Sequence, residues 1–128
     1  MKQTNSKKYL VCILLALGFG SAIAQDAIRE GMKLNHVLMF KWAQNADQEA
    51  KAEVLYLFKG LPKKVDGFES IAVRHADGST GGFDSVLVLQ FVSKKALKTY
   101  EKHPDHLRIA EIGPALLEKF AYVDYWNY

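Results

Sequence analysis

Histidine and tyrosine side chains are the groups in this chain of 128 residues whose types and spacing could carry out chemistry. His103 and His106 lie in a His-Pro-Asp-His sequence, in which Pro104 is well placed to begin a helix. A helix N-terminus lowers the pKa of a nearby histidine, which keeps the imidazole neutral and able to accept a proton. The pair is therefore a candidate for general-base chemistry, and local helix capping is the structural alternative.

Two further side chains, His36 and Tyr100, could lie close to this pair in the folded chain. Whether they do depends on the strand and the helix that carry them. His36 alternates with apolar residues in a strand predicted over 34–42, so it should point into an apolar interior. A buried histidine that is simply hydrogen-bonded satisfies the same pattern. Tyr100 belongs to a helix predicted over 94–102, and the break at Pro104 leaves open whether it reaches His106.

The other elements follow from apolar periodicity and turn residues, with Asp47 and Ser93 as expected helix N-caps. The order β-α-β-β-α-β is typical of an α+β, ferredoxin-like domain with an antiparallel sheet. Helices on one face leave the other face uncovered, and apolar residues on both strand faces favour a homodimer. Beyond the strand over 34–42 and the helix over 94–102, we predict a helix over 47–60, strands over 68–76, 83–92 and 120–128, and a helical stretch from Pro104.

The first 24 residues read as a secretory signal peptide. A lysine-containing start precedes an apolar run over 10–19, and Ala22-Ile23-Ala24 is the small-x-small pattern that signal peptidase needs. A membrane-spanning helix needs roughly 20 apolar residues, about twice the length of this run. We therefore predict cleavage before Gln25, a linker over 25–31, one domain over 32–128, and a periplasmic or secreted protein with no membrane attachment after cleavage.

The leader also accounts for the net charge of +3, because it holds three lysines and no acidic residue. After its removal 14 basic residues face 14 acidic ones, so the domain lacks the basic surface that nucleic-acid binding requires. Cys12, the only cysteine, lies in the leader as well. The mature chain therefore has no disulfide, no thiolate metal site and no thiol nucleophile.

Several segments together resemble the stress-responsive dimeric α/β-barrel (Dabb) family. They are the opening Asn-His-Val-Leu-Met-Phe-Lys over 35–41, Phe83-Asp84 before an apolar strand, the segment from Tyr100 to His106, and the ending Val123-Asp124-Tyr125. The resemblance covers about residues 32–126 and follows the family's order. It implies a ferredoxin-like monomer, a dimer whose two sheets form a barrel, and an apolar pocket between sheet and helices.

The resemblance also implies roles for two residues. In family members that act as polyketide cyclases, the second histidine of His-Pro-x-His is the general base, and the tyrosine six residues earlier polarises the substrate. These positions are His106 and Tyr100 here. They would allow an aldol-type ring closure without a cofactor, in which the base removes an acidic C–H proton and the phenol polarises a carbonyl.

The sequence leaves three functions open and does not decide whether the protein is an enzyme. The first is an exported homodimer that binds a small apolar or aromatic molecule, with no cofactor and no nucleic-acid partner. The second is a cofactor-independent lyase, cyclase or isomerase that uses His106 and Tyr100. The third is a metal bound through the histidines. For the pocket we expect ligand contacts from His36, Leu38, Phe40, His103 and Tyr122.

Overall fold

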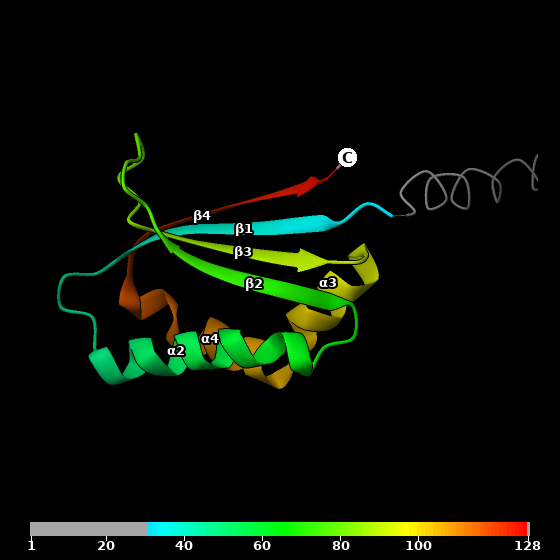
Figure 1. Cartoon of the computed structure of the whole chain (residues 1–128). Helices are drawn as coiled ribbons and strands as arrows, with labels where there is room; N and C mark the ends of the chain where they lie inside the picture. The colour runs from blue at the N-terminus through cyan, green and yellow to red at the C-terminus, as the bar shows by residue number, and fades with distance from the viewer. Residues whose placement is uncertain (1–30, 128) are drawn as a thin grey trace, which may run out of the picture. The chain divides into compact units, whose positions relative to one another are not determined.

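The computed structural model describes residues 31–127, and Figure 1 shows the path of the chain. The predicted signal peptide lies outside the described residues, as does the predicted linker except for Gly31. The 3-10 turns η1 (Leu61–Lys63) and η2 (Pro114–Leu116) separate longer elements. Those elements are β1 (Leu34–Trp42), α2 (Gln48–Gly60), β2 (Phe68–His75), β3 (Ser85–Phe91), α3 (Lys94–Lys102), α4 (Pro104–Ile112) and β4 (Leu117–Trp126).

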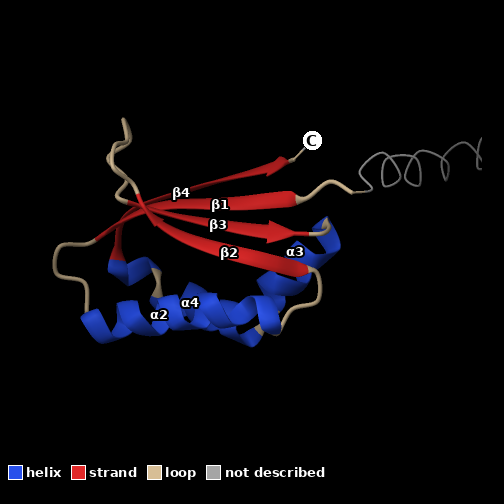
Figure 2. Ribbon diagram, viewed as in Figure 1, coloured by secondary structure: helices blue, strands red, loops and turns tan. Residues whose placement is uncertain are grey.

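The strands form one antiparallel sheet in the order β2-β3-β1-β4, and the helices pack against one of its faces (Figure 2). This arrangement confirms the predicted ferredoxin-like α+β fold. The second helical unit is divided into α3 and α4 at Pro104, because proline has no N–H to continue the helical hydrogen bonding. Within residues 31–127, no helix combines the length and apolar character that crossing a bilayer requires.

The helix starts follow the predicted caps. The Asp47 carboxylate accepts from the N–H of Ala50 at 2.7 Å, and the Ser93 hydroxyl accepts from the N–H of Ala96 at 3.1 Å. Each bond satisfies one of the backbone donors that the first turn of a helix leaves free. These caps fix where α2 and α3 begin, and so which side chains they turn toward the sheet.

Two strand starts differ from the sequence prediction, and three strand ends differ from it by one or two residues. The last strand begins at Leu117 rather than at 120, because Leu117 pairs with Trp42 beyond a register shift between Lys41 and Trp42. The preceding hairpin strand begins at Ser85 rather than at 83. These changes reflect pairing across the sheet, which local periodicity does not encode.

Alternation along the strands gives the sheet two faces. The inner face, toward the helices, holds the core, and Leu87, Leu89 and Phe91 of β3 are completely buried there. We define it by the residues Leu34, His36, Leu38, Phe40, Phe68, Ile71, Val73, Leu87, Leu89, Phe91, Phe120, Tyr122, Asp124 and Trp126, which share one side through the antiparallel register.

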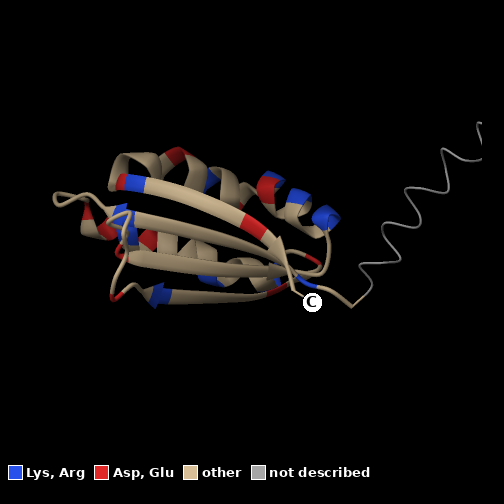
Figure 3. Cartoon of the chain, turned by 90° about the horizontal axis from the view of Figure 1, so that it is seen from above, with Lys and Arg blue, Asp and Glu red and all other residues tan. Residues whose placement is uncertain are grey.

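The outer face is the opposite side of the sheet, and no described element covers it (Figure 1). One row across it is entirely apolar and consists of Ala72, Val88, Val37 and Val123. Lys, Arg, Asp and Glu lie near the strand ends, and long stretches of strand between them carry no charge (Figure 3). The outer face therefore has an apolar row beside a polar row of Ser70, Gln90, Asn35 and Tyr125, with charged side chains near the strand ends.

Candidate functional site

A cavity of about 450 Å³ lies between the inner face and the helices. The inner-face residues of β1 form its floor, and α2, α4 and η2 form its walls. This volume falls within the range of small-molecule pockets. Most of the lining is apolar, and it includes the predicted Leu38 and Phe40 together with Val54, Phe58, Ile109, Pro114 and Leu117.

Tyr100 places a phenol in the lining of this cavity, close to His36 and His106. Its side chain is 1% exposed, and its ring packs against Phe68, Phe91 and His106 at centroid distances of 5.5, 5.3 and 4.4 Å. Within residues 31–127 its hydroxyl has no hydrogen-bond partner. Burial, and to a lesser degree the charge of Glu101, raises the pKa of Tyr100 well above its ordinary value. The phenol therefore stays protonated and can donate.

His106 lies beside this phenol across the α3–α4 break and also lines the cavity. Its Nδ1 lies 2.9 Å from the carbonyl oxygen of Glu101. A carbonyl can only accept, so Nδ1 carries a proton and donates it. In the neutral ring Nε2 is then unprotonated and available as a base. The structure thus brings together the two residues whose proximity the sequence spacing left open.

His36 lines the same end of the cavity from β1, with its ring centroid 6.2 Å from that of Tyr100. Its Nδ1 is 2.6 Å from Oδ1 of Asp124, its cross-strand partner on β4. No site role was predicted for Asp124 from the sequence. The pairing of β4 with β1 places this carboxylate opposite His36, and that pairing includes a register shift near Trp42. In the sequence, only the alternation of Asp124 with Phe120 and Tyr122 indicated which face of the sheet Asp124 lies on.

Two predicted ligand contacts occupy other positions. The His103 side chain accepts from the N–H of Asp105 at 3.1 Å and caps α4, so it takes the alternative structural role and is not part of the cavity lining. Tyr122 is 61% exposed, and its ring lies 5.5 Å from that of His36, next to the cavity but not in its lining. Of the predicted contacts, His36, Leu38 and Phe40 line the cavity.

A metal bound through the histidines receives no support from this geometry. Among the described residues, no three His, Cys, Asp or Glu side chains lie close enough together to hold an ion. The Nδ1 atoms of His36, His103 and His106 all have protein partners already.

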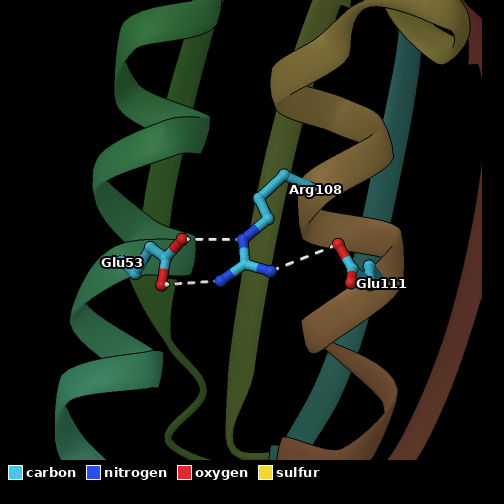
Figure 4. A network of polar contacts seen from close by, with 3 residues as sticks. All are labelled: Glu53, Arg108 and Glu111. Carbon is cyan, nitrogen blue, oxygen red and sulfur yellow. Dashed lines mark hydrogen bonds and ion pairs between the residues drawn. The ribbon is translucent and has the colours of Figure 1, made fainter.

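An ion-pair network links α2 and α4, the two helices of the cavity wall, on their solvent side. Arg108 of α4 donates to Glu53 of α2 at 2.9 Å and to Glu111 at 3.2 Å (Figure 4). Val54 and Ile109, the chain neighbours of Glu53 and Arg108, line the cavity. The network therefore spans the outside of the wall.

Fold and site together define a ferredoxin-like α+β domain with a ligand-sized cavity between sheet and helices. The chain belongs to the Dabb, or stress-responsive A/B barrel domain, family, whose model matches residues 34–127. The match confirms the family resemblance seen in the sequence.

Solved structures with the same fold include several described as dimers. A dimeric ferredoxin-like protein of unknown function from Bacteroides fragilis is 27% identical, covering 73% of this chain and 94% of its own, with a TM-score of 0.56. A Dabb family protein from Mesorhizobium loti is 18% identical, covering 73% and 95%, with a TM-score of 0.61.

One similar structure is an enzyme. The hydroxynitrile lyase from Passiflora edulis is 14% identical, covering 75% of this chain and 94% of its own, with a TM-score of 0.66. At this identity the likeness establishes a common fold. None of the curated proteins matches the chain.

Proposed function

We propose that this protein is an exported homodimer that binds a small apolar or aromatic molecule carrying a carbonyl or hydroxyl group. The observation that carries the proposal is the buried Tyr100 hydroxyl, which has no partner among the described residues and lies at one end of an apolar cavity. Leaving a buried donor unpaired costs about 1–3 kcal/mol. A ligand oxygen that accepts from this hydroxyl would offset that cost.

The experiment compares two ligands that differ in this one acceptor. The full chain is expressed in a bacterial host, the protein is purified from the secreted fraction, and acetophenone and ethylbenzene are titrated by protein-observed NMR. We expect acetophenone to bind about tenfold more tightly, since one hydrogen bond contributes about 1 kcal/mol or somewhat more. Tyr100→Phe should remove this preference and leave ethylbenzene binding intact. Equal binding of both ligands to the unmodified protein would contradict the proposal.

The homodimer is supported by the uncovered apolar row of the outer face and by the dimeric neighbour from B. fragilis. Export is supported by the sequence over 1–24. Mass spectrometry of the secreted protein should give a mature chain that begins at Gln25. Leu14→Arg, which places a charge in the apolar run, should keep the uncleaved protein inside the cell.

A second candidate function is cofactor-independent proton transfer, as in a lyase or isomerase. The observation in its favour is the Nδ1 bond of His106, which leaves Nε2 as the basic atom beside Tyr100. In this reaction Nε2 removes a proton from the carbon next to a ligand carbonyl. Tyr100 donates a hydrogen bond to the oxygen on which negative charge develops. The structure from P. edulis, which is described as a hydroxynitrile lyase, supports the idea that this fold can carry an enzyme activity.

Proton abstraction can be tested without knowledge of the natural substrate. Benzoylacetone, which has an acidic methylene between two carbonyls, is incubated in D₂O, and exchange at that methylene is followed by NMR. Enzymatic abstraction predicts exchange faster than in buffer, lost in His106→Ala and kept in His103→Ala. Exchange at the buffer rate, with benzoylacetone bound, would reject the second candidate and leave the binding function in place.

A further inference from the structure

Helix α3 carries a stripe of positive charge on its solvent side. Lys94, Lys98 and Lys102 follow one another at intervals of four residues, and Lys95 lies beside them. All four side chains belong to exposed residues. At the rise per residue of an α-helix, the stripe is about 12 Å long. Without the predicted leader, basic and acidic residues are equal in number, so the balanced charge of the domain is unevenly distributed over its surface.

These lysines lower the stability of the helix that carries them. Lys94 and Lys95 lie in its first turn, where the positive end of the helix dipole favours acidic side chains instead. Lys98 is one turn from both Lys94 and Lys102, and like charges at this spacing repel one another. Residues that break a local rule without a compensating contact are expected at functional sites. The stripe is therefore a candidate binding surface.

No ion pair within residues 31–127 offsets this charge. Glu101, the acidic residue of α3, pairs with none of the four lysines. Ion pairs do form near the start of α4, since Lys64 donates to Asp105 at 2.6 Å. The exposed ammonium groups of α3 thus add their positive potentials and attract an anion from solution.

The surroundings of the stripe indicate which anionic partner it fits. Single-stranded nucleic acids bind where aromatic side chains stack with the bases, but the exposed aromatic residues in the described part of the chain lie on α2 and β4. A helix that binds lipid inserts its apolar face into the bilayer. The apolar residues of α3, which are Ala96, Leu97 and Tyr100, are buried in the core instead. A narrow row of cations matches a linear polymer with regularly spaced carboxylates.

We propose that α3 binds a linear acidic polysaccharide, whose successive carboxylates pair with the ammonium groups of Lys94, Lys98 and Lys102. This inference rests on the proposed export, which brings the protein into contact with polymers outside the cytoplasm. The helices cover the inner face of the sheet, so a homodimer formed through the outer face leaves α3 accessible on each subunit (Figure 2). Such binding would retain the exported protein where the polymer accumulates.

Polygalacturonate, a chain with a carboxylate on every sugar, tests this surface. The full chain is expressed in a bacterial host and purified from whichever fraction contains it, and its affinity for the polymer is measured by calorimetry. We expect binding that weakens as salt is added, because binding releases counterions and salt screens exposed charges. Dextran, a neutral polysaccharide, should not bind.

Substitutions on the stripe should remove the interaction. Lys94→Gln, Lys98→Gln and Lys102→Gln combined should weaken polygalacturonate binding tenfold or more, because each exposed ion pair contributes up to about fivefold. Arginine at the same three positions should keep the affinity within about twofold, since arginine retains the positive charge. Circular dichroism should show that both variants are folded.

A matched variant separates the stripe from the net charge of the protein. Lys41→Gln, Lys51→Gln and Lys119→Gln combined remove the same amount of charge from β1, α2 and β4. This variant should change the affinity for polygalacturonate by less than about twofold. An equal loss in both triple glutamine variants would overturn the proposal, because net charge alone would then account for binding.

The remaining outcomes identify a different partner or none. Tighter binding of phosphatidylglycerol vesicles than of polygalacturonate would assign α3 to a membrane surface and overturn the proposal. Tighter binding of single-stranded DNA would assign α3 to nucleic acid, with the same consequence. Absence of polygalacturonate binding at low salt would reject the proposal outright. Export is judged separately, from the N-terminus of the secreted protein, so either inference can fail while the other holds.

Discussion

The two faces of the sheet use alternate residues of the same strands for different purposes. On β1 the inner face presents Leu34, His36 and Leu38, while the intervening outer-face residues are Asn35 and Val37. The inner face combines a buried core with a cavity and titratable groups. The outer face has apolar residues that no described element covers. Folding therefore depends mainly on one set of residues, and the proposed homodimer would use the set between them.

The largest effect is expected from a substitution in the core of the inner face. Phe91 is completely buried and packs against Phe68 at a centroid distance of 4.4 Å. Phe91→Ala should lower the free energy of unfolding by about 3–5 kcal/mol, because it removes buried surface and leaves a void. Urea denaturation followed by circular dichroism measures this loss. A loss below about 1 kcal/mol would show that the inner face does not dominate stability.

A substitution of intermediate effect should separate assembly from folding. Val88 lies in the apolar row of the outer face. Val88→Asp buries a charge if that row is the dimer interface, and we expect dimer affinity to fall by about 3 kcal/mol, roughly a hundredfold. Light scattering should detect monomers at micromolar concentration, with the circular dichroism spectrum retained. Leu107→Asp, on the exposed side of α4, should leave the oligomeric state unchanged.

The smallest effect is expected on the solvent side of the helices. Arg108, Glu53 and Glu111 have exposed side chains, so water and salt screen their attraction. Arg108→Ala should leave the urea midpoint within error of the original protein at physiological salt. A clear drop in the urea midpoint would mean that the ion pairs between α2 and α4 stabilise the cavity wall. Stability would then depend on the solvent side of the helices as well as on the inner face of the sheet.

Local patterns predicted the elements of this domain because each pattern reports on its own segment. The alternation over 34–42 correctly placed His36 on the same face as Leu38 and Phe40. The signals of Asp47 and Pro104 likewise identified where helices begin. The fold followed from the order of these elements and from the family resemblance.

Contacts between elements were harder to anticipate. The spacing from Tyr100 to His106 does not fix their distance, because the angle between α3 and α4 at Pro104 determines it. Asp124 gained a role only through the register of β4 on β1. His103 shows that closeness in the sequence to the candidate base His106 does not place a residue in the cavity, since its side chain caps α4 instead.

The pairing of β1 with β4 brings the two ends of the domain together. The N–H of Asn127 donates to the carbonyl of Lys33 at 2.9 Å, so β4 ends where the approach to β1 begins. A short peptide could join these points, and new termini could be opened in the exposed loop over 77–82. The domain thus has the geometry for circular permutation, and an evolving gene could insert it within another protein without separating the host's flanking segments.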